Sequence, residues 1–378
     1  MRSVRDIGVF ENIPILVRAA LNEPTKHGVV ANEYRLRRAL PTLRFLTERG
    51  ARVIVISHIG EKGIETLAPV AQELGKLISG VSFCPETIGA GVRSAVRNLS
   101  AGNVLVLENL RRNRGEMLND ASFAHELAAL ADVFVEDSFD TCHRKHASIV
   151  SVPKLLPSYA GILLEEEIEV LSRARTPDHP ALAVIGGAKF NTKEPVLTAL
   201  LATYDHVFVG GALASDVLKA AGHEVGKSLV SSDANTRIAK LLSSPKLVVP
   251  VDVVVVPGTA TTRDQARVTS VEQIGVDEVI LDIGPATCAL LANRVRKAKT
   301  ILWNGPLGNY ENGFVDATDK LARAIASADV HSVVGGGDTV AAIEKLGLFS
   351  RFSFVSTGGG AMLDFLAYGT LPGIEALG

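Results

Sequence analysis

The sequence repeats one pattern along almost its whole length: a short run of β-branched apolar residues, a turn rich in glycine or polar residues, and a segment with helical periodicity. In the first half the apolar runs begin at Ile15, Val53, Val104 and Val133, and each is almost continuously apolar. Strands that are buried on both faces have this composition. Alternating strands and helices of this kind predict a parallel sheet with helices on both faces.

The pattern is interrupted once, by a charged helical segment at 161–174 and a proline-bracketed turn at 176–180. Apolar runs then resume at 181–185, 207–209, 279–281, 301–303, 332–334 and 353–355. A chain of 378 residues is longer than one hydrophobic core usually supports. The predicted fold class is therefore α/β, with two Rossmann-like domains, parallel sheets flanked by helices, joined by a hinge helix across a cleft. The predicted boundaries are 1–160, 161–174 for the hinge helix, and a second domain from 175.

Charge and cysteine content exclude several classes of protein. The 39 Lys+Arg and 41 Asp+Glu give a formal charge of −2, so the chain has no general attraction for nucleic acid or an anionic membrane. Its three cysteines are too few and too far apart for a disulfide framework or a four-Cys zinc site. The longest apolar stretch, at 247–257, is interrupted by Pro250 and Asp252 and is about half of what a membrane span needs. Because charged residues occupy the N-terminus where a secretion signal would be apolar, we expect a cytoplasmic protein with no nucleic-acid or membrane partner.

Glycine stands directly after almost every apolar run of the second half. These turns are Gly186-Gly187, Gly210-Gly211, Gly284-Pro285, Gly305-Pro306, Gly335-Gly336-Gly337-Asp338 and Gly358-Gly359-Gly360. In open parallel sheets ligands bind at the carboxyl ends of the strands, and a helix N-terminus at that edge favours phosphate. One such turn is as readily structural as functional. Six of them predict a phosphate or nucleotide site.

Two familiar phosphate motifs fit less well. Residues 221–228 resemble a loosened Walker A loop, but they follow a helical stretch instead of a strand, so we interpret them as a helix exit and surface turn. Gly89 and Gly91 have Ser94 where the dinucleotide fingerprint needs a third small residue, and no apolar parallel strand precedes them. Nicotinamide binding is therefore the weaker interpretation.

The strand ends of the first half carry cations and hydrogen-bonding groups instead of glycines. They are Arg18, Asn22, Ser57, His58, Glu108, Asn109, Arg111 and the segment 137–146. A single arginine is most often a surface charge, but several at one sheet edge fit a small phosphorylated or carboxylated metabolite. A metal site at Cys142, His143 and His146 would need a fourth ligand. It would also be opposed by the charges of Arg144 and Lys145, so we favour anion binding or packing for these histidines.

Together these motifs resemble one family, phosphoglycerate kinase, over nearly the whole chain. The matching stretches of the first half are 17–24, 34–41, 57–60, 107–111, 136–139 and 143–148. Those of the second half are 186–189, 222–229, 303–306, 335–339, 356–361 and 371–373. So many motifs in this order and spacing are not expected by chance.

The resemblance implies reversible phosphoryl transfer between 1,3-bisphosphoglycerate and MgADP, giving 3-phosphoglycerate and MgATP, in glycolysis and gluconeogenesis. It implies ATP/ADP and Mg²⁺ as cofactors and a monomeric enzyme with only small-molecule partners. The acid substrate would bind to domain 1–160 and the nucleotide to domain 175–355, while the segment 356–378 would cross back to the first domain. Substrates on separate domains imply hinge closure at the helix 161–174.

The resemblance also implies a set of site residues. Arg35 and Lys189 would be catalytic, Arg35 stabilising the charge on the phosphoryl group in flight and Lys189 guiding that group from the nucleotide side. The acid substrate would be held by Asn22, Arg35, His58, Arg111 and Arg144. The nucleotide would be bound by Gly186, Gly187, Lys189, Lys193, Gly210, Gly211, Asn304, Pro306, Glu311, Gly337, Asp338, Thr339, Gly358 and Gly359. Among these, Lys193 would contact the phosphates, Glu311 the ribose and Asp338 the magnesium ion.

Two positions depart from the family pattern. Ala20 stands where the family has an aspartate that helps to orient the glycerate hydroxyl. Glu61 stands where the family has an arginine for the substrate phosphate, although Lys62 and Arg112 add cations nearby. Two hypotheses follow. We favour an active phosphoglycerate kinase with an altered acid site, because the catalytic and nucleotide-phosphate residues are retained; the alternative is a nucleotide-binding paralogue with lost or altered acid-substrate activity.

Overall fold

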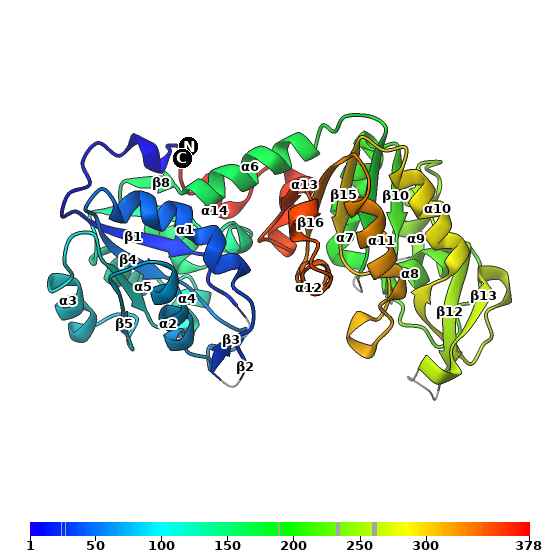
Figure 1. Cartoon of the computed structure of the whole chain (residues 1–378), viewed down its shortest axis with the longest axis horizontal. Coiled ribbons are helices and arrows are strands. Elements are labelled where there is room, and N and C mark those ends of the chain that lie inside the picture. The colour runs from blue at the N-terminus through cyan, green and yellow to red at the C-terminus, as the bar shows by residue number, and fades with distance from the viewer. Residues whose placement is uncertain (24, 27, 188–189, 232–234, 259–262) are drawn as a thin grey trace. The chain divides into compact units, whose positions relative to one another are not determined.

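The chain folds into two compact units, each built on a six-stranded parallel sheet (Figure 1). The computed structural model describes residues 1–23, 25–26, 28–187, 190–231, 235–258 and 263–378. The first unit comprises Met1–Glu169 and Thr370–Gly378, and the second comprises Val170–Gly369. The predicted α/β class with two such domains is confirmed.

The sheet of the first unit has the strand order β5-β6-β4-β1-β7-β8, and all of its pairs are parallel. Its strands are β1 (Pro14–Ala19), β4 (Arg52–Ile56), β5 (Val81–Cys84), β6 (Val104–Leu107), β7 (Val133–Asp137) and β8 (Ser158–Ala160). Its helices are α1 (Tyr34–Thr47), α2 (Ala68–Leu77), α3 (Ala90–Arg97), α4 (Arg114–Met117), α5 (Ala121–Ala128), the start of α6 (Ile162–Ala174), and α14 (Pro372–Glu375). A small antiparallel hairpin joins β2 (Thr25–Lys26) to β3 (Val29–Val30).

Helix α1 shows how the sequence pattern becomes a core. Leu36, Leu40, Leu43 and Leu46 recur at three- and four-residue spacing, and all four are buried. They pack with residues of β1 and β4 such as Val53 in one hydrophobic cluster. The apolar stripe therefore faces the sheet, and the ends of the sheet strands are held in fixed positions beside it.

The start of α6 is held by a carboxyl group from the end of β7. Asp137 Oδ1 accepts hydrogen bonds from the backbone N–H of Leu163 at 3.0 Å and of Leu164 at 3.3 Å. A side chain at Gly161 would not fit, because its Cβ would lie 2.1 Å from Asp137 Oδ1. The glycine before α6 is thus required for this cap.

The parallel sheet of the second unit has the strand order β11-β10-β9-β15-β16-β17. Its strands are β9 (Ala181–Ile185), β10 (His206–Val209), β11 (Leu247–Val248), β15 (Thr300–Asn304), β16 (His331–Gly335) and β17 (Phe354–Val355). The helices of this unit are α7 (Phe190–Thr203), α8 (Ala212–Ala220), α9 (Asn235–Leu242), α10 (Pro285–Val295), α11 (Asp316–Ala326), α12 (Gly337–Lys345) and α13 (Gly360–Tyr368).

The apolar run at 279–281 does not join this sheet, which corrects one expectation from the sequence. It lies in β14 (Glu278–Ile283), which pairs antiparallel with β12 (Asp252–Pro257) in a separate sheet completed by β13 (Arg267–Ser270). Four of the six residues of β14 are only partly buried, because this small sheet is not covered like the parallel one. Gly284-Pro285 therefore opens α10 after an antiparallel strand, and five of the six glycine turns follow strands of the parallel sheet.

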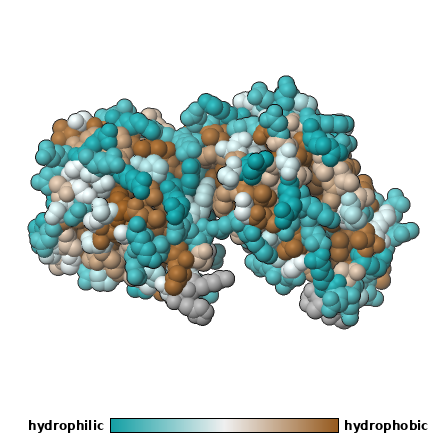
Figure 2. Space-filling model, viewed as in Figure 1, coloured by the Kyte–Doolittle hydropathy of each residue, from teal (hydrophilic) through white to brown (hydrophobic). Residues whose placement is uncertain are grey.

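The surface mixes hydrophilic residues with smaller hydrophobic areas on the face shown in Figure 2. Among the described residues, none of the helices combines the length and the apolar character needed to cross a bilayer.

Candidate functional site

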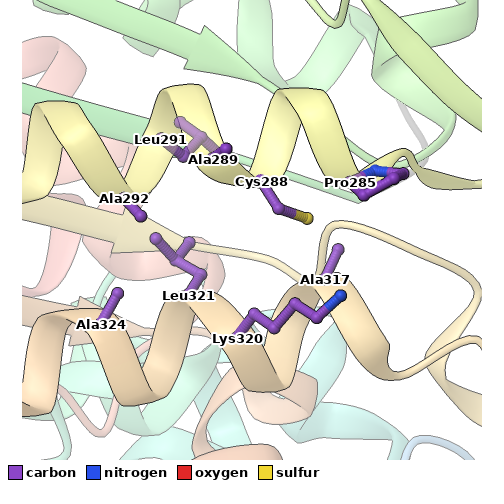
Figure 3. Close-up of a pocket in the computed structure, with 9 residues that line it drawn as sticks. All are labelled: Pro285, Cys288, Ala289, Leu291, Ala292, Ala317, Lys320, Leu321 and Ala324. Carbon is purple, nitrogen blue, oxygen red and sulfur yellow. The ribbon is translucent and has the colours of Figure 1, made fainter.

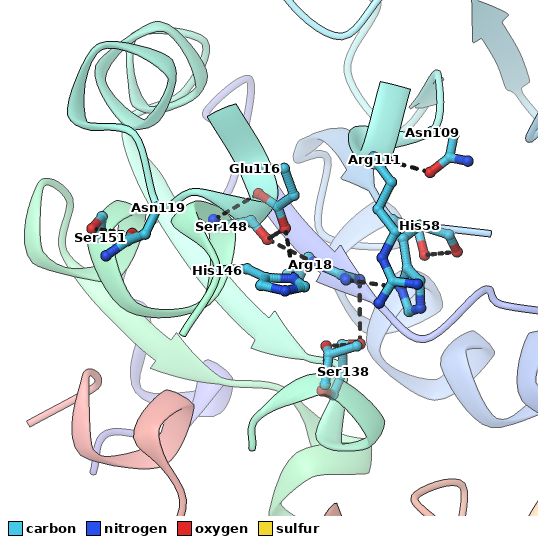
Figure 4. A network of polar contacts seen from close by, with 12 residues as sticks. Arg18, His58, Asn109, Arg111, Glu116, Asn119, Ser138, His146, Ser148 and Ser151 are labelled. Atoms are coloured by element: carbon cyan, nitrogen blue, oxygen red, sulfur yellow. Dashed lines mark hydrogen bonds and ion pairs between the residues drawn. The ribbon is translucent and has the colours of Figure 1, made fainter. Parts of the chain in front are cut away.

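Arg18 organises the polar centre of the first unit (Figure 4). It is fully buried in β1, and its guanidinium donates to Ser148 Oγ at 3.1 Å, Ser138 Oγ at 3.2 Å and the carbonyl of Ala19 at 2.9 Å. Its Nη2 lies 3.1 Å from Nδ1 of His58. Because an arginine only donates, Nδ1 of His58 is the acceptor, and Nε2 carries the imidazole hydrogen. The sequence placed Arg18 after the first strand as a ligand-edge cation; the structure places it inside the strand, where it orients His58.

His58 is kept neutral by this environment. Burial lowers the pKa of His58 well below its usual value, and the charge of Arg18 lowers it further. A neutral imidazole whose Nδ1 is occupied has one remaining group, the Nε2–H, with which to donate to an anion.

The charges of Arg144 and Arg18 act on Arg111, and burial together with all three arginines lowers the pKa of His58 and of His146. We call these five residues the cation cluster, after its three arginines. Arg111 follows β6 in the short helix Leu110–Arg112 and is 7% exposed. Burial lowers the pKa of the Arg111 guanidinium, followed by the charges of Arg144 and Arg18. Its Nε is buried and has no hydrogen-bond partner within the described residues. A guanidinium held among like charges with an unused buried donor is suited to binding an anion.

The carboxyl groups around the cation cluster do not neutralise it. Glu116 and Asp140 act on Arg111 as negative charges, but Glu116 is already engaged: it accepts from the backbone N–H of Ser148 at 3.0 Å and from the Ser148 hydroxyl at 2.6 Å. Burial raises the pKa of Glu136 well above its usual value, which disfavours a negative charge on this third carboxyl. Arg18, Arg111 and Arg144 therefore outnumber Glu116 and Asp140, the two carboxylates whose charges act on Arg111.

Asn22 and Arg35 reach the same place through the turn at Gly60. The backbone N–H of Gly60 donates to Asn22 Oδ1 at 2.9 Å, and the carbonyl of Gly60 accepts from Arg111 Nη1 at 2.5 Å. Arg35, in the first turn of α1, donates from Nη1 to the carbonyl of Asn22 at 2.9 Å. The structure thus links Asn22, Arg35 and Arg111 by successive hydrogen bonds.

The two departures from the family pattern lie in different environments. Ala20 is fully buried, and its methyl side chain offers no polar group. Glu61 is exposed and directly follows Gly60, the turn that Asn22 and Arg111 both contact. Glu23, three residues after Ala20, is a buried carboxylate that the sequence did not single out: its Oε1 accepts from the backbone N–H of Arg35 at 2.5 Å.

In the second unit, the glycine turns at the carboxyl ends of β9, β10 and β15 pack directly against one another. A Cβ on Gly186 would lie 2.0 Å from the carbonyl oxygen of Pro306, one on Gly211 would lie 2.6 Å from the nitrogen of Gly187, and one on Gly210 would lie 2.7 Å from Leu307. Close backbone approach therefore requires glycine at 186 and 211, whereas at 210 the close atom belongs to the Leu307 side chain. The structure brings Gly186, Gly187, Gly210, Gly211 and Pro306 together.

The turns after β16 and β17 adjoin this group. A Cβ on Gly336 would lie 3.3 Å from Asn304 Oδ1, and one on Gly359 would lie 3.4 Å from the Cα of Gly336. Asn304, at the end of β15, donates from Nδ2 to the carbonyl of Gly359 at 3.4 Å. Thr339 is fully buried, and its hydroxyl accepts from the N–H of Gly305 at 2.9 Å, so it ties the start of α12 to the β15 turn.

Gly337 and Asp338 differ from these packing residues. Both are exposed in the first turn of α12, and a Cβ on Gly337 would meet no atom within 4 Å. The space beside Gly337 is open, and the N–H groups and dipole of a helix N-terminus favour a phosphate nearby. Glu311 is exposed in the short helix Tyr310–Asn312, which follows the β15 turn. Gly358 donates its N–H to Ser356 Oγ at 3.1 Å.

The structure describes one of the two lysines that were predicted to bind the nucleotide. Lys193 lies in the first turn of α7, and a Cβ on Gly187 would be 3.0 Å from its Nζ, so the ammonium group lies over the β9 turn. Lys189 lies outside the described residues.

The described residues contain no group of three or more His, Cys, Asp or Glu side chains placed to hold a metal ion. Mg²⁺ does not require one, because in nucleotide enzymes it is held by one or two carboxylates together with the phosphates and water. The exposed carboxylate of Asp338 beside the open end of α12 fits that role.

A separate cavity of about 310 Å³ lies between α10 and α11 (Figure 3). Its walls are mostly apolar, with Cys288 from α10 and Lys320 from α11 as the polar exceptions. Pro285 comes from the one glycine turn that does not follow a strand of the parallel sheet, and none of the other lining residues belongs to a glycine turn, so the cavity is distinct from the glycine edge.

A parallel α/β unit with a cation cluster, together with a second whose glycine turns open onto helix N-termini, defines a phosphotransferase that acts on a small acid. The phosphoglycerate kinase family model matches residues 4–368. The chain is 42% identical to the phosphoglycerate kinase of Pelotomaculum thermopropionicum, covering 100% of this chain and 98% of that protein. It is 45% identical to that of Salinispora tropica, covering 96% and 95%.

Solved structures agree with these sequence matches. The structure of phosphoglycerate kinase from Coxiella burnetii superposes with a TM-score of 0.83 at 37% identity, covering 99% of this chain and 98% of the other. The crystal structure of the enzyme from Pyrococcus horikoshii gives a TM-score of 0.89 at 30% identity, covering 100% and 98%.

The chain belongs to the phosphoglycerate kinase family. Its activity is that of a phosphoglycerate kinase, a glycolytic, ATP-binding phosphotransferase with a carboxyl group as the acceptor. The first of the two hypotheses from the sequence is therefore the one that the comparisons support.

Proposed function

We propose that the cation cluster of the first unit binds 3-phosphoglycerate and 1,3-bisphosphoglycerate. The observation that carries this proposal is the excess of positive charge around Arg111, whose buried Nε lacks a partner within the described residues. Arg111 and Arg144 would hold the substrate phosphate, and His58 would donate from Nε2. Asn22 and Arg35 would contact the end of the substrate that carries the reacting carboxylate, since Arg35 lies at the far end of the hydrogen-bonded series that begins at Arg111.

We further propose that ATP and ADP bind at the glycine edge of the second unit. The open space before Gly337 supports phosphate binding there, and the ammonium of Lys193 over Gly187 supplies a cation for the same phosphates. Adenosine would lie against the turns of β9 and β10 with Asn304 and Pro306, and Glu311 would receive the ribose hydroxyls. Asp338 would hold Mg²⁺, which when bound neutralises charge on the nucleotide phosphates.

The chemistry needs no protein nucleophile. In phosphoryl transfer, catalysis is mainly positioning of the two oxygens in line and stabilisation of charge on the group in flight. Arg35 is the residue of the first unit proposed for that stabilisation, and Lys189 is the residue of the second. A guanidinium presents a rigid fork of donors to a phosphoryl group, and its charge persists at any physiological pH.

In this chain we propose that Glu23 takes over part of the role of the missing aspartate at position 20. The family carboxylate would act on the substrate hydroxyl; Glu23 is buried and acts instead on Arg35, through its backbone N–H and its guanidinium. The acid site is therefore rebuilt around the orientation of the arginine.

The connector and the oligomeric state remain proposals as well. Helix α6 contains the boundary between the two units, at residues 169 and 170, and we propose the segment 161–174 as the hinge between the acid-binding and nucleotide-binding parts. We propose a monomer, as the resemblance to the phosphoglycerate kinase family implies.

A coupled spectrophotometric assay with 3-phosphoglycerate and MgATP tests the proposal. Turnover that saturates in both substrates is expected, with activity lost when Mg²⁺ is chelated and restored when it is added back. Normal binding of ADP in a calorimeter without turnover of 3-phosphoglycerate would show that the acid site accepts a different substrate.

A further inference from the structure

A second pocket of the same unit lies at the opposite edge of the parallel sheet from the glycine turns. It has a volume of about 470 Å³, within the usual range of about 300–1,000 Å³ for small-molecule sites. It is lined by the first residues of β9 and β10 and by the last turn of α10, and we call it the basal pocket. The strands β9 and β10 connect it to the glycine edge, about 15 Å away at the usual rise per residue.

The basal pocket has an apolar wall and a cationic wall. Pro180, Leu182 and Leu290 form the first. His206, Arg294 and Lys297 form the second. Burial, followed by the charge of Arg294, lowers the pKa of His206, so the imidazole is neutral and the two long side chains supply the charge.

Two nitrogens of this cationic wall lack the partners that buried polar atoms normally have. Nε of Arg294 and Nδ1 of His206 are buried, and neither makes a hydrogen bond to any described residue. Among the residues that the structure describes, neither Arg294 nor Lys297 forms an ion pair. Asp205, the acid whose charge acts on His206, already accepts from His179 and from the N–H of Ala181 through one oxygen.

The dipole of α10 explains only part of this arrangement. Cations near a helix C-terminus are stabilised by the exposed carbonyls, and α10 ends at Val295. That interaction does not require a buried Nε. Arg296, at the same helix end, shows the ordinary case: it is exposed and donates to Asn293 Oδ1 at 3.4 Å.

We propose that the basal pocket binds a small carboxylic acid with an apolar body, whose carboxylate lies against Arg294 and whose body lies against Leu182 and Leu290. A monoanion matches a wall with a single buried guanidinium nitrogen and one exposed ammonium better than a multiply charged phosphate does. The imidazole of His206 donates a second hydrogen bond from Nδ1. The site is separate from both substrate sites of the kinase reaction.

Amide chemical shifts of the full-length protein test this with benzoate as the probe and benzamide as its uncharged match. The backbone amides of Ala181, Leu182 and His206 report on the pocket directly, and saturating 3-phosphoglycerate keeps the cation cluster of the first unit occupied. Saturable shifts of these amides with benzoate are expected, at a dissociation constant of about 1 mM, together with no saturable shift with benzamide.

Two variants, Arg294→Gln and Lys297→Gln, test whether the cationic wall binds the carboxylate, and Arg296→Gln is their control. Arg294→Gln is expected to weaken benzoate binding by about tenfold or more, because it removes a charge-assisted hydrogen bond, whereas Arg296→Gln removes the same charge two residues away and leaves binding unchanged. Lys297→Gln changes an exposed side chain and is the second test, with an expected weakening of benzoate binding of about threefold.

The inference is overturned by equal shifts with benzoate and benzamide, by equal weakening in the 294 and 296 variants, or by an absence of saturable shifts in the wild-type protein. If Arg294→Gln does not fold, the benzamide comparison and Lys297→Gln still decide the question.

Discussion

Glu23 holds Arg35 at two points. Its Oε1 accepts the backbone N–H of Arg35 at 2.5 Å, and its Oε2 lies 3.6 Å from Nη1 of the same residue. The carboxylate side chain is only 2% exposed, whereas the arginine side chain remains 24% exposed. A buried carboxylate therefore fixes the first turn of α1 and aligns a guanidinium that remains partly exposed.

Replacing Glu23 with glutamine should mainly lower kcat. The amide can keep the contact with the backbone N–H, but its NH₂ would then face the guanidinium, so Arg35 loses an ion pair at 3.6 Å, worth about 1 kcal/mol. A fall in kcat of about fivefold is expected, with a smaller change in KM for 3-phosphoglycerate. Steady-state kinetics measure both. Glu33→Gln is the matched control, since Glu33 pairs with Arg37 at 2.5 Å on the surface of α1. An unchanged kcat for Glu23→Gln would remove its positioning role.

Replacing Glu61 with arginine should lower KM for 3-phosphoglycerate. Glu61 is exposed beside Gly60, whose backbone contacts Asn22 and Arg111. Reversal of one exposed charge near a phosphate is expected to change the binding free energy by about 1 kcal/mol, or about fivefold in KM, and the effect should shrink at high salt. Glu48→Arg makes the same charge change at the exposed end of α1. If both variants shift KM equally, Glu61 does not face the substrate.

Much of this site was predictable because strand ends are predictable. A near-continuous apolar run followed by glycine or a cation indicates where a parallel strand stops, and the carboxyl ends of such strands meet at one edge. The prediction was wrong for 279–281, because an apolar run of that length does not reveal whether its strand is parallel or antiparallel. The sheet that β14 joins is determined by its antiparallel pairing with β12.

The supporting residues were not predictable, because their partners lie far away in the sequence. Arg18 meets Ser138 and Ser148, which are 120 and 130 residues away. Glu23 looks like a turn residue until α1 brings the N–H of Arg35 to it. An arginine in an otherwise apolar strand was the one available signal, since a buried charge requires partners.

Replacing Lys189 with alanine should reduce turnover sharply. An ammonium that guides the transferring phosphoryl group acts mainly in the transition state, so a fall in kcat of about a hundredfold is expected, with KM for ATP less affected. Single-turnover and steady-state rates measure this. Lys219→Ala, at the exposed end of α8, controls for the loss of a surface charge. Wild-type kcat in Lys189→Ala would refute its catalytic role.

Replacing Gly337 with alanine separates a ligand-facing glycine from packing glycines. The new Cβ would meet no protein atom within 4 Å, so thermal stability should not fall. A bound phosphate at the start of α12 would meet that methyl group, and KM for ATP should rise about tenfold. Gly8→Ala, which also meets no atom within 4 Å, is the control in the first unit. A normal KM for ATP would place the phosphates elsewhere.

The buried carboxyl of Asp137 should make stability depend on pH. Burial raises the pKa of Asp137 from 3.8 to about 8, although the N–H groups of Leu163 and Leu164 oppose the shift. The native state therefore keeps a proton that the unfolded state releases. This contribution to stability is complete below about pH 4 and is lost as the pH rises towards about 8, at up to about 1.4 kcal/mol per pH unit.

Asp137→Asn removes this titration while keeping an oxygen for both backbone N–H groups. We expect the free energy of unfolding, measured with urea at several pH values from about 5 to 8, to fall less steeply in the variant than in the parent. Glu136, whose pKa burial also raises, contributes a fall of the same sign in both proteins. Asp132→Asn, at an exposed position just before β7, should follow the parent. Parallel curves for Asp137→Asn and the parent would mean that Asp137 is ionised in the native protein and that its contacts with the start of α6 outweigh its burial.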